Sequence, residues 1–549
     1  ESIDRERVIG YFKNLFSAET GIPQEEIEPH LSLDSYGIDS MMVMSLTDRL
    51  EKDFGLLSKT IFFECQTLDA VADYFIKLHT LKLIDLLGST EIPVQTLKQD
   101  EYQNLKSEPT ATLSQQNSTD TEPASRDRVL APLAKPVDVA IIGLAGRYPG
   151  ANNLTQFWEN LAAGIDSISQ IPIERWDHSS LYDPIRGKPG KSNSKWGGFI
   201  EDADCFDPLF FNMSPREAEF IDPQERLFLQ CAWETIEDAG YTPENIAPEL
   251  APFAGGKVGV FVGVMYQEYQ LYGVELTQKG QPIALSGSAA SIANRVSYFF
   301  NFHGPSMAID TMCSSSLTSI HLACESLYSG SCEVALAGGV NLSLHQNKYL
   351  ALGQGRFTSS KGRCESFGKG GDGYVPGEGV GAVLLKPIDK AIADGDHIYG
   401  VIKSTAINHG GKTNGYSVPN PHAQTSVISN ALARSGIQAG DVTYLEAHGT
   451  GTILGDPIEI AALSKAYQQD TNTHQFCALG SVKSNIGHCE SAAGIAGLTK
   501  ILLQIKNRKL APSIHSDILN PAINFSTSPF IVQQHLNEWP RKSRETSRG

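Results

Sequence analysis

A cysteine at the start of a predicted helix constrains this chain more than any other feature. Cys313 follows the short apolar stretch Ser306–Ile309, which predicts a buried strand. After it, Leu317, Ile320 and Cys324 recur at helical spacing. The sequence therefore predicts a sharp strand-to-helix turn, where the positive end of the helix dipole favours a thiolate. Alone, such a cysteine is more often a buried apolar residue, so the other motifs decide between packing and chemistry.

Two histidines occupy turns of the same kind. Residues 444–452 predict a strand that delivers His448 into a glycine turn, and residues 480–488 do the same for His488. A single histidine is more often a structural residue than a catalyst. However, α/β folds place their sites at the carboxyl ends of strands. One thiol and two imidazoles at three such ends therefore favour a reaction centre.

Charge and composition exclude several classes of function. The net charge of −18 argues against non-specific binding to nucleic acid or to an anionic membrane. No apolar run approaches the about 20 residues that a membrane-spanning helix needs, and the start of the chain has no signal-peptide pattern. The nine cysteines are scattered without a Cys-x-x-Cys pair, which argues against a metal site or a disulfide framework. Together these features predict a cytoplasmic protein.

Glycine-rich stretches do not indicate nucleotide binding. The stretch 143–146 lacks the Gly-x-Gly-x-x-Gly spacing of a dinucleotide site, and no P-loop motif occurs anywhere in the chain. The glycine run 368–381 leads into a predicted strand at 380–385 without a Lys-Ser/Thr pair. We therefore interpret that run as a structural loop.

Residues 1–80 predict a small, acidic, all-α unit of four helices, with 15 Asp and Glu against 7 Lys and Arg. Apolar residues at helical spacing mark a first helix over 8–16, and a last helix is expected from Thr67. Between them Asp39 is predicted to cap another helix. Ser40 follows it at the first turn. A serine there often caps its own helix, but Asp39 is better placed to do so, which leaves the Ser40 hydroxyl free.

With the Gly-x-Asp-Ser motif at 37–40, this unit resembles an acyl carrier protein. The resemblance implies that a phosphopantetheinyl transferase attaches 4′-phosphopantetheine covalently to Ser40. Residues 81–136 are polar and poor in aromatic residues, which predicts a flexible linker. Within it, residues 81–87 either extend the last helix or dock on a neighbour. A flexible tether suits a carrier that delivers its cargo to another domain.

From Val137 strands and helices alternate, beginning with a predicted buried strand over 137–143, so an α/β domain is predicted over 137–549. Its motifs resemble those of β-ketoacyl synthases, in particular the ketosynthases of modular polyketide synthases. The resemblance rests on Asp-Thr-Met-Cys-Ser-Ser-Ser at 310–316, on Glu-Ala-His-Gly-Thr-Gly-Thr-x-x-Gly-Asp-Pro-Ile-Glu at 446–459 and on Lys-Ser-Asn-Ile-Gly-His at 483–488, with support from 222–226, 294–297 and 372–378.

Three details are similar to the bacterial type in which acyltransferases act in trans. They are the Thr-Met-Cys wording at 311–313, the Cys-Glu-Ser after His488, and the Phe-Phe-Glu at 62–64. The resemblance also implies a thiolase fold, in which two α/β halves give five layers, usually as a homodimer. The halves are expected over about 137–390 and 391–549.

The family resemblance implies a role for each site residue. Cys313 accepts an acyl chain from a carrier thioester, and His448 and His488 donate hydrogen bonds to the oxygen of a malonyl-carrier thioester as it loses carbon dioxide. Lys483 supports the histidines electrostatically, while Thr450 and Thr452 contact the pantetheine arm. The implied partners are these carrier thioesters and the neighbouring domains of the synthase.

One departure from the family pattern limits the prediction. Family members end with a Ser-x-Phe-Gly-x-Gly-Gly-type loop that supplies an oxyanion amide, and no such loop follows Trp539. The similar stretch 366–371 matches a loop in the middle of the family's chain. We therefore expect a ketosynthase that lacks its C-terminal end, either as a fragment of a longer polypeptide or as an incomplete domain.

Three other functions remain open at this stage. One is a non-elongating domain that accepts and passes acyl chains, and another is a docking segment without activity. The intact set of one cysteine and two histidines argues against both. A Cys-His protease is weaker still, because nothing else in the chain indicates peptide recognition. The acyl substrate, its oxidation pattern and the final product do not follow from the sequence.

Overall fold

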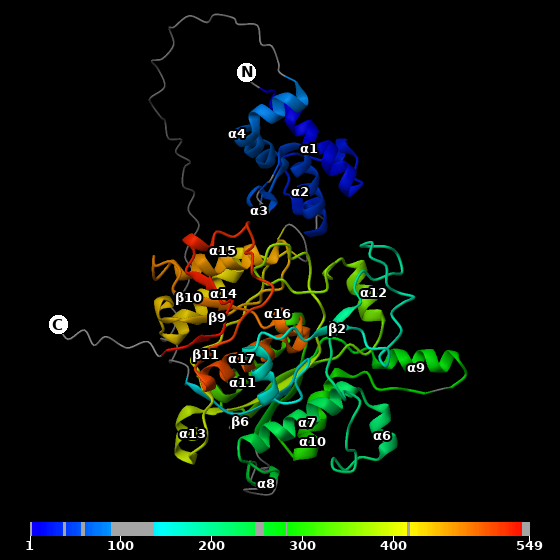
Figure 1. Ribbon diagram of the computed structural model, residues 1–549, viewed down its shortest axis with the longest axis vertical. Helices are drawn as coiled ribbons and strands as arrows, with labels where there is room; N and C mark the ends of the chain where they lie inside the picture. The colour runs from blue at the N-terminus through cyan, green and yellow to red at the C-terminus, as the bar shows by residue number, and fades with distance from the viewer. Residues whose placement is uncertain are drawn as a thin grey trace, which may run out of the picture. The chain divides into compact units, whose positions relative to one another are not determined.

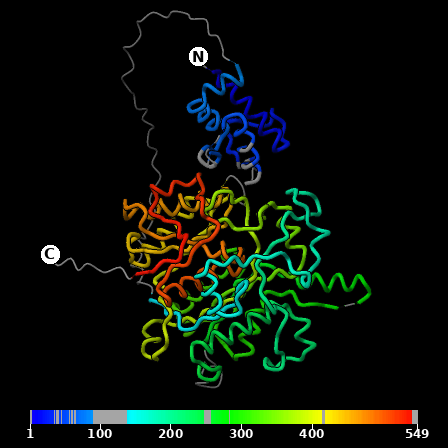
Figure 2. Tube along the Cα trace, viewed as in Figure 1, coloured from blue at the N-terminus to red at the C-terminus, as the bar shows by residue number. Residues whose placement is uncertain are grey.

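The computed structural model describes residues 3–36, 40–55, 57, 61–88, 137–246, 257–281, 283–413 and 418–540. The chain divides into a small N-terminal unit and a large unit that begins at Pro136. Figures 1 and 2 show the two units in matching colours. The predicted linker from residue 89 onward and the predicted cap Asp39 lie outside the described residues.

The described part of the small unit is helical. Its α-helices are α1 (Arg5–Thr20), α2 (Ser40–Phe54), α3 (Ile61–Glu64) and α4 (Leu68–Leu87), with 3-10 turns η1 (Gln24–Glu26) and η2 (Leu33–Tyr36). Buried side chains from the α-helices, Phe12, Leu46, Phe62 and Phe75 among them, form one core. Thr67 caps α4, because its hydroxyl accepts a hydrogen bond from the Ala70 amide at 3.1 Å.

The last helix of this unit runs beyond the predicted boundary at residue 80. Residues 81–87 extend α4 to Leu87, the first of the two alternatives that the sequence allowed. Leu83 is fully buried, so the extension packs on the same core. Ser40 is the first residue of α2, but its side chain lies outside the described part of the structure.

A six-stranded mixed sheet forms the centre of the large unit. Its strand order is β5 (Ser306–Ile309), β4 (Val258–Gly263), β6 (Val334–Asn341), β7 (Gly379–Pro387), β1 (Val139–Arg147) and β8 (Gly400–Ile402). The β5–β4 and β4–β6 pairs are parallel, and the other pairs are antiparallel. The predicted strands at 137–143 and 380–385 correspond to β1 and β7.

Helices cover both faces of this sheet. Alternate residues of β7 point to opposite sides, so that Val380, Ala382 and Leu384 belong to one core and Val383 and Leu385 to the other. One face packs against α7 (Pro223–Asp238) and α10 (Ala289–Phe300), and the other against α11 (Ser315–Tyr328) and α17 (Ala493–Asn507). Both faces are therefore apolar, as expected for a sheet between two helix layers.

A second, parallel sheet lies beyond α17. Its order is β12 (Phe530–Val532), β10 (Cys477–Gly480) and β9 (Tyr444–Glu446). Its outer face packs against α15 (Gly455–Tyr467) with α14 (Pro421–Ser435) beside it. Figure 1 shows the resulting five layers, helices and sheets in alternation, from α7 and α10 to α14 and α15. This is the layer order that the family resemblance implied.

The remaining elements lie around these layers. The helices are α5 (Leu154–Ala162), α6 (Pro215–Phe220), α8 (Pro243–Ile246), α9 (Tyr269–Gln278), α12 (Asn347–Gln354), α13 (Ile388–Asp394) and α16 (Lys483–Ile486). Two small antiparallel sheets join β2 (Ile168–Gln170) to β3 (Trp196–Gly198) and β11 (Lys509–Leu510) to β13 (Asn537–Glu538). Among the described residues, no helix combines the length and apolar character needed to cross a lipid bilayer.

Two local predictions differ from the structure. The sequence predicts a buried strand at Ser306–Ile309, but β5 is the edge strand of its sheet and Met307 is 41% exposed. Short apolar runs do not distinguish an edge strand from a central one, because pairing is decided by distant segments. The strand predicted over 137–143 also ends later, because β1 continues through Arg147, with a register shift between Ile141 and Gly143.

Candidate active site

Cys313 lies in a tight turn between β5 and α11. Met312–Ser314 form a 3-10 turn, and Met312 has a φ of 57°, which is uncommon for a residue with a side chain. The turn is held by Ser315, whose hydroxyl accepts from the Thr311 amide at 2.9 Å and donates to the Met312 carbonyl at 2.6 Å. This closed network fixes the turn that carries the half-buried Cys313, just before α11 begins at Ser315.

The thiol is more basic than the sequence suggested. Burial, followed by the negative charge of Glu490, raises the pKa of Cys313 to about 11, and Lys483 opposes the rise. The prediction relied on the dipole of the helix, which begins two residues after Cys313, at Ser315, and did not include the lost hydration of the thiol. At neutral pH Cys313 is therefore a protonated thiol that must lose its proton as it reacts.

His448 follows β9 in a turn held by two carboxylates of α15, the half-buried Glu459 and the buried Asp456. The Glu459 carboxylate accepts from the His448 and Gly449 amides at 2.6 and 2.8 Å. The Asp456 carboxylate accepts from the Gly451 amide at 3.1 Å. These hydrogen bonds pair backbone amides of the turn that have no partner within the turn itself. The imidazole of His448 is left exposed toward the open side of the site.

His488 is buried and held in one tautomer. Its Nδ1 accepts a hydrogen bond from the Glu490 amide at 3.0 Å, so in the neutral ring the proton resides on Nε2. The backbone amide of His488 donates to the Val375 carbonyl at 2.7 Å, which fixes the chain beside β7. The ring of Tyr374 lies 4.9 Å from that of His488, centroid to centroid.

Lys483 influences both imidazoles. It opens α16 after β10, and its side chain is 4% exposed. Burial and, second, the positive charge of Lys483 lower the pKa of both His448 and His488. The ring of His448 is open to the cavity, so burial lowers its pKa less than it lowers that of His488. The positive charge of Lys483 lowers the pKa of His448 as well. Both rings are therefore neutral at neutral pH and able to donate a hydrogen bond.

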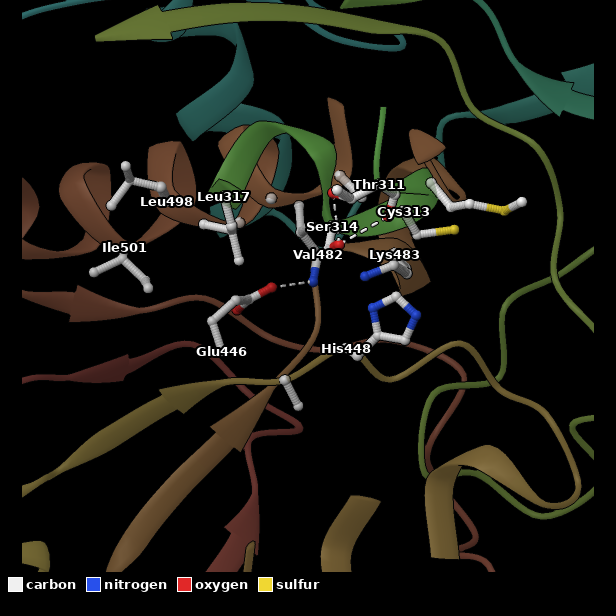
Figure 3. A pocket seen from close by; sticks show the side chains of 15 residues that line it. Thr311, Cys313, Ser314, Leu317, Glu446, His448, Val482, Lys483, Leu498 and Ile501 are labelled. Carbon is white, nitrogen blue, oxygen red and sulfur yellow. Dashed lines mark hydrogen bonds between the residues drawn. The ribbon is translucent and has the colours of Figure 1, made fainter. Parts of the chain in front are cut away.

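These residues meet where two cavities join. One cavity of about 500 Å³ is lined by Cys313, His448 and Lys483 at one end and by Leu498 and Ile501 at the other. Figure 3 shows the first three side chains together, each arriving from a different segment, with the apolar residues on the far side. The site thus combines a reactive end with an apolar wall.

The second cavity, of about 950 Å³, is also lined by Cys313 and His448, and His488 contributes to its wall. Thr450 and Thr452 line this cavity as well, with their hydroxyl oxygens 3.1 Å apart. The structure therefore brings together all six residues of the large unit that the sequence proposed. It places the two threonines along the cavity rather than at its reactive end.

Sequence reasoning missed several residues that organise this site. Glu459 belonged to a quoted motif, so its spacing from His448 was a usable signal for the carboxylate that holds the turn. Glu446 accepts from the Val482 amide and pairs with Lys500 at 2.9 Å. Lys348 and Glu490 form a fully buried ion pair behind His488. For Lys348 the sequence held no signal, since only the fold brings α12 to this place.

Comparisons with known proteins agree with this geometry. Residues 137–391 match the model of the β-ketoacyl synthase N-terminal domain and residues 399–517 that of its C-terminal domain, while residues 10–75 match a phosphopantetheine attachment site. A solved ketosynthase domain, OzmH KS7 for oxazolomycin from Streptomyces albus JA3453, is 54% identical with a TM-score of 0.72, over 75% of this chain and 71% of that one. This chain belongs to the β-ketoacyl synthase family, whose members are transferases.

The curated relatives define its type more closely. Polyketide synthase PksL of Bacillus subtilis is 58% identical and polyketide synthase ThaG of Burkholderia thailandensis 53%, each over 98% of this chain. The ketosynthase from module 6 of the bacillaene synthase of Bacillus subtilis is 41% identical with a TM-score of 0.68, over 74% of this chain and 68% of that one. The chain is a carrier-and-ketosynthase segment of the polyketide synthase type. It spans 12% and 10% of the lengths of PksL and ThaG.

The carrier unit takes covalent 4′-phosphopantetheine, as its phosphopantetheine attachment domain indicates. The position of Ser40 fits this group. Ser40 opens a helix of 15 residues, and the unpaired amides at such an end stabilise a phosphate. A serine hydroxyl also supplies the oxygen that a phosphodiester needs. When bound, the group presents a thiol at the end of a long arm, on which an acyl chain is carried as a thioester.

Proposed function

We propose that this chain passes an acyl chain from a carrier to Cys313 and extends it by decarboxylative Claisen condensation with a malonyl-carrier thioester. One observation carries the proposal: a thiol, two neutral imidazoles and a lysine ammonium from separate segments converge where the two cavities join. A thiol accepts acyl groups, and paired neutral donors stabilise an enolate. The two needs of the reaction are therefore met side by side.

The first step is transfer of the acyl group. Cys313 sulfur attacks the thioester carbonyl carbon, the thiol of the carrier leaves, and the proton of Cys313 moves to the departing sulfur. Because the pKa of Cys313 is raised, a neutral imidazole beside it serves as the proton relay. The backbone amide of Cys313 donates to the carbonyl oxygen as negative charge develops there.

The second step is the loss of carbon dioxide from the malonyl thioester. The electron pair of the breaking carbon–carbon bond moves toward the thioester oxygen, where His448 and His488 each donate a hydrogen bond. Burial and Lys483 keep both rings neutral, and each neutral ring has one N–H group that donates to this oxygen. The resulting carbanion attacks the carbonyl carbon of acyl-Cys313, and the thiolate of Cys313 leaves. The product is a β-ketoacyl thioester on the carrier.

The carrier and its partners follow from the same reaction. A phosphopantetheinyl transferase modifies Ser40, and Thr450 and Thr452 contact the arm as it reaches Cys313 along the larger cavity. The Phe-Phe-Glu, Thr-Met-Cys and Cys-Glu-Ser details support an acyltransferase that acts in trans. Neighbouring synthase domains supply and consume the acyl chain. We place the reaction in the cytoplasm, where malonyl thioesters are available and a reducing environment keeps the thiol of Cys313 free.

The large unit forms a homodimer through β5. Among the described strands β5 pairs only with β4, so its other edge presents unpaired backbone groups. Exposed Tyr298, Met307 and Leu317 lie on β5 or on the helices beside it. A second copy of this edge pairs the backbone groups and covers the apolar side chains. Sedimentation measures this: Met307→Lys is expected to yield monomer, and a monomeric parent contradicts the proposal.

Further strands complete the second sheet. Within the described residues, β9 pairs only with β10, and the 950 Å³ cavity runs along its other edge between Leu445 and the apolar residues Val427 and Leu432 of α14. The parallel pair β10–β9 resembles the parallel pair β5–β4 of the large sheet. On its other side β4 pairs with β6, whereas no described strand pairs with the other side of β9. A strand that carries the family's glycine loop fits this slot and supplies the second oxyanion amide.

Two experiments test the proposed function. The first loads the Ser40 carrier with an acyl group and follows transfer to Cys313 by intact mass. Transfer is expected in the parent and absent in Cys313→Ala, with exposed Cys205→Ala as the matched control. Transfer that persists in Cys313→Ala contradicts the assignment of the nucleophile.

The second experiment adds malonyl-carrier and measures both carbon dioxide and β-ketoacyl product, with this chain and with one extended through the glycine loop. Product is expected to rise strongly in the extended chain, together with its unfolding temperature. Transfer to Cys313 without any carbon dioxide release in the extended chain would instead identify a non-elongating acyl-transfer domain. Equal stability of the two chains would contradict the strand in the slot.

A further inference from the structure

A fully buried ion pair lies behind His488. Lys348 of α12 contacts the carboxylate of Glu490, and neither side chain has any exposure. Asn341, at the end of β6, joins them: its amide donates to Glu490 at 3.0 Å, and its oxygen accepts from Lys348 at 3.4 Å. Burying two charges costs several kcal/mol for each ion, so a gain in stability does not explain the pair. Its surroundings point to another role.

Glu490 contacts the surroundings of His488 with its backbone and with its side chain. Its amide donates to His488 Nδ1 at 3.0 Å, and its carboxylate accepts from the Tyr374 hydroxyl at 3.3 Å. Tyr374 in turn packs against the His488 ring. Glu490 has a φ of 47°, a conformation that strains residues with a side chain and persists only where the surroundings hold it. Lys348 and Asn341 provide that hold.

The same pair lies next to the turn of Cys313, because the 3-10 turn Glu490–Ala492 packs against the 3-10 turn Met312–Ser314. Glu490 raises the pKa of Cys313, while Lys348 and Lys483 lower it. The other titratable groups around the thiol are His448, His488, Asp310, Tyr266 and Tyr374. Tyr266 lies beside Lys348, with Lys348 Nζ 4.4 Å from its ring centroid. Two opposite charges of one buried pair therefore act on the thiol with opposite signs.

We propose that Lys348 and Glu490 are positioning residues of the condensation site, which hold His488 in its Nε2–H tautomer and balance the charge beside Cys313. The part about His488 rests on the proposed function, because it names the reaction in which that proton is used. The part about Cys313 does not, since it concerns the ionisation of a thiol in the resting protein. Glu490 without Lys348 leaves a bare negative charge near the nucleophile. Lys348 without Glu490 leaves a bare positive one.

The test measures how fast Cys313 reacts with iodoacetamide between pH 7 and pH 10, with peptide mapping to follow that cysteine. At a fixed pH the rate is expected to fall about tenfold in Lys348→Met and to rise about tenfold in Glu490→Gln, since one pKa unit changes the thiolate fraction tenfold. The double variant, which removes both charges, is expected to return to within about threefold of the parent. Lys386→Met is the matched control, because Lys386 also belongs to a buried ion pair, at the end of β7 with Asp396.

A merely structural role predicts a different pattern. If the pair only stabilises the core, both single variants change the alkylation rate of Cys313 in the same direction, and the two changes add in the double variant. That result would overturn the proposal. If Lys348→Met does not fold, the alkylation rates of the other two variants still test the proposal. Glu490→Gln is expected to react about tenfold faster than the parent, and the double variant at nearly the rate of the parent. Carbon dioxide release from malonyl-carrier distinguishes a failure of the proposed function from a failure of the charge balance at Cys313. Shifted alkylation in a protein that never releases carbon dioxide contradicts the proposed function but leaves the charge balance standing.

Discussion

The imidazole rings of His448 and His488 lie 5.3 Å apart, centroid to centroid, with an interplanar angle of 82°. They are 40 residues apart in the sequence: His448 follows β9, and His488 follows α16, which comes after β10, the parallel neighbour of β9. Parallel pairing brings equivalent strand ends to one edge of a sheet. In the proposed reaction the two rings donate to a single oxygen, which can be tested by replacing each of them.

Replacing either histidine by glutamine is expected to separate acyl transfer from condensation. Loss of one donor to a developing oxyanion costs on the order of 10²–10³ in rate. We expect His448→Gln and His488→Gln each to reduce carbon dioxide release from malonyl-carrier by about that factor. Acyl loading of Cys313, followed by intact mass, is expected to change far less. Equal loss in both assays would show that the histidines do not act mainly on decarboxylation.

Stability is expected to fall with acid because His488 is buried in its neutral form. Its pKa is depressed in the folded protein, so the unfolded chain binds a proton that the folded one does not once the pH drops below about 6.5. Stability is therefore fully present above that pH and is lost as the pH falls. Between pH 7.5 and 5.5 this histidine is expected to account for about 1.4 kcal/mol of the loss. Urea unfolding of the parent and of His488→Gln at both pH values measures it, and an equal loss in the two proteins contradicts it.

The carboxylate of Glu459 is expected to support the reaction through the turn of His448. Glutamine has the same shape but offers only one acceptor oxygen, so one of the His448 and Gly449 amides loses its partner. A buried donor without a partner costs about 1–3 kcal/mol. We expect Glu459→Gln to lower the free energy of unfolding by that amount and to slow condensation more than acyl loading. Glu325→Gln, at an exposed ion pair with Arg434, serves as the control.

The turn of Cys313 is expected to tolerate no side chain at Gly263. A Cβ there would lie 2.5 Å from the Ser316 amide nitrogen, because the end of β4 touches the start of α11. We expect Gly263→Ala to displace this turn and to abolish acyl loading, with a clear drop in the unfolding temperature. At Gly410 a Cβ would lie 3.6 Å from its nearest heavy atom, so Gly410→Ala is the matched control. Normal loading in Gly263→Ala would contradict the close packing of this turn.

Much of the chain could be predicted without a structure because its chemistry is encoded in local motifs. Residues 310–316, 446–459 and 483–488 pointed to a β-ketoacyl synthase, and the Gly-x-Asp-Ser of 37–40 pointed to a carrier with 4′-phosphopantetheine. The comparisons confirm both families and the cofactor. Local spacing also predicted β1 and β7. The roles of the individual site residues stay predictions until the experiments above are done.

Other features required the tertiary structure, because they depend on segments far apart in the sequence. Whether Ser306–Ile309 is an edge or a central strand is decided by what pairs with it, and no short window contains that information. The pKa of Cys313 depends on burial and on Glu490, whereas the sequence showed only the helix that follows the thiol.

The sequence by itself determined which groups are candidates for the chemistry of this protein: a thiol, two imidazoles and a carrier serine, each marked by a turn of its own. Only the tertiary structure decided how those groups are charged and held. Lys348 and Glu490 are 142 residues apart and meet because α12 packs beside the end of β6. Electrostatic interactions act through space over a few ångströms and disregard distance along the chain. The nucleophile can therefore be found in a motif, but its ionisation follows from the fold.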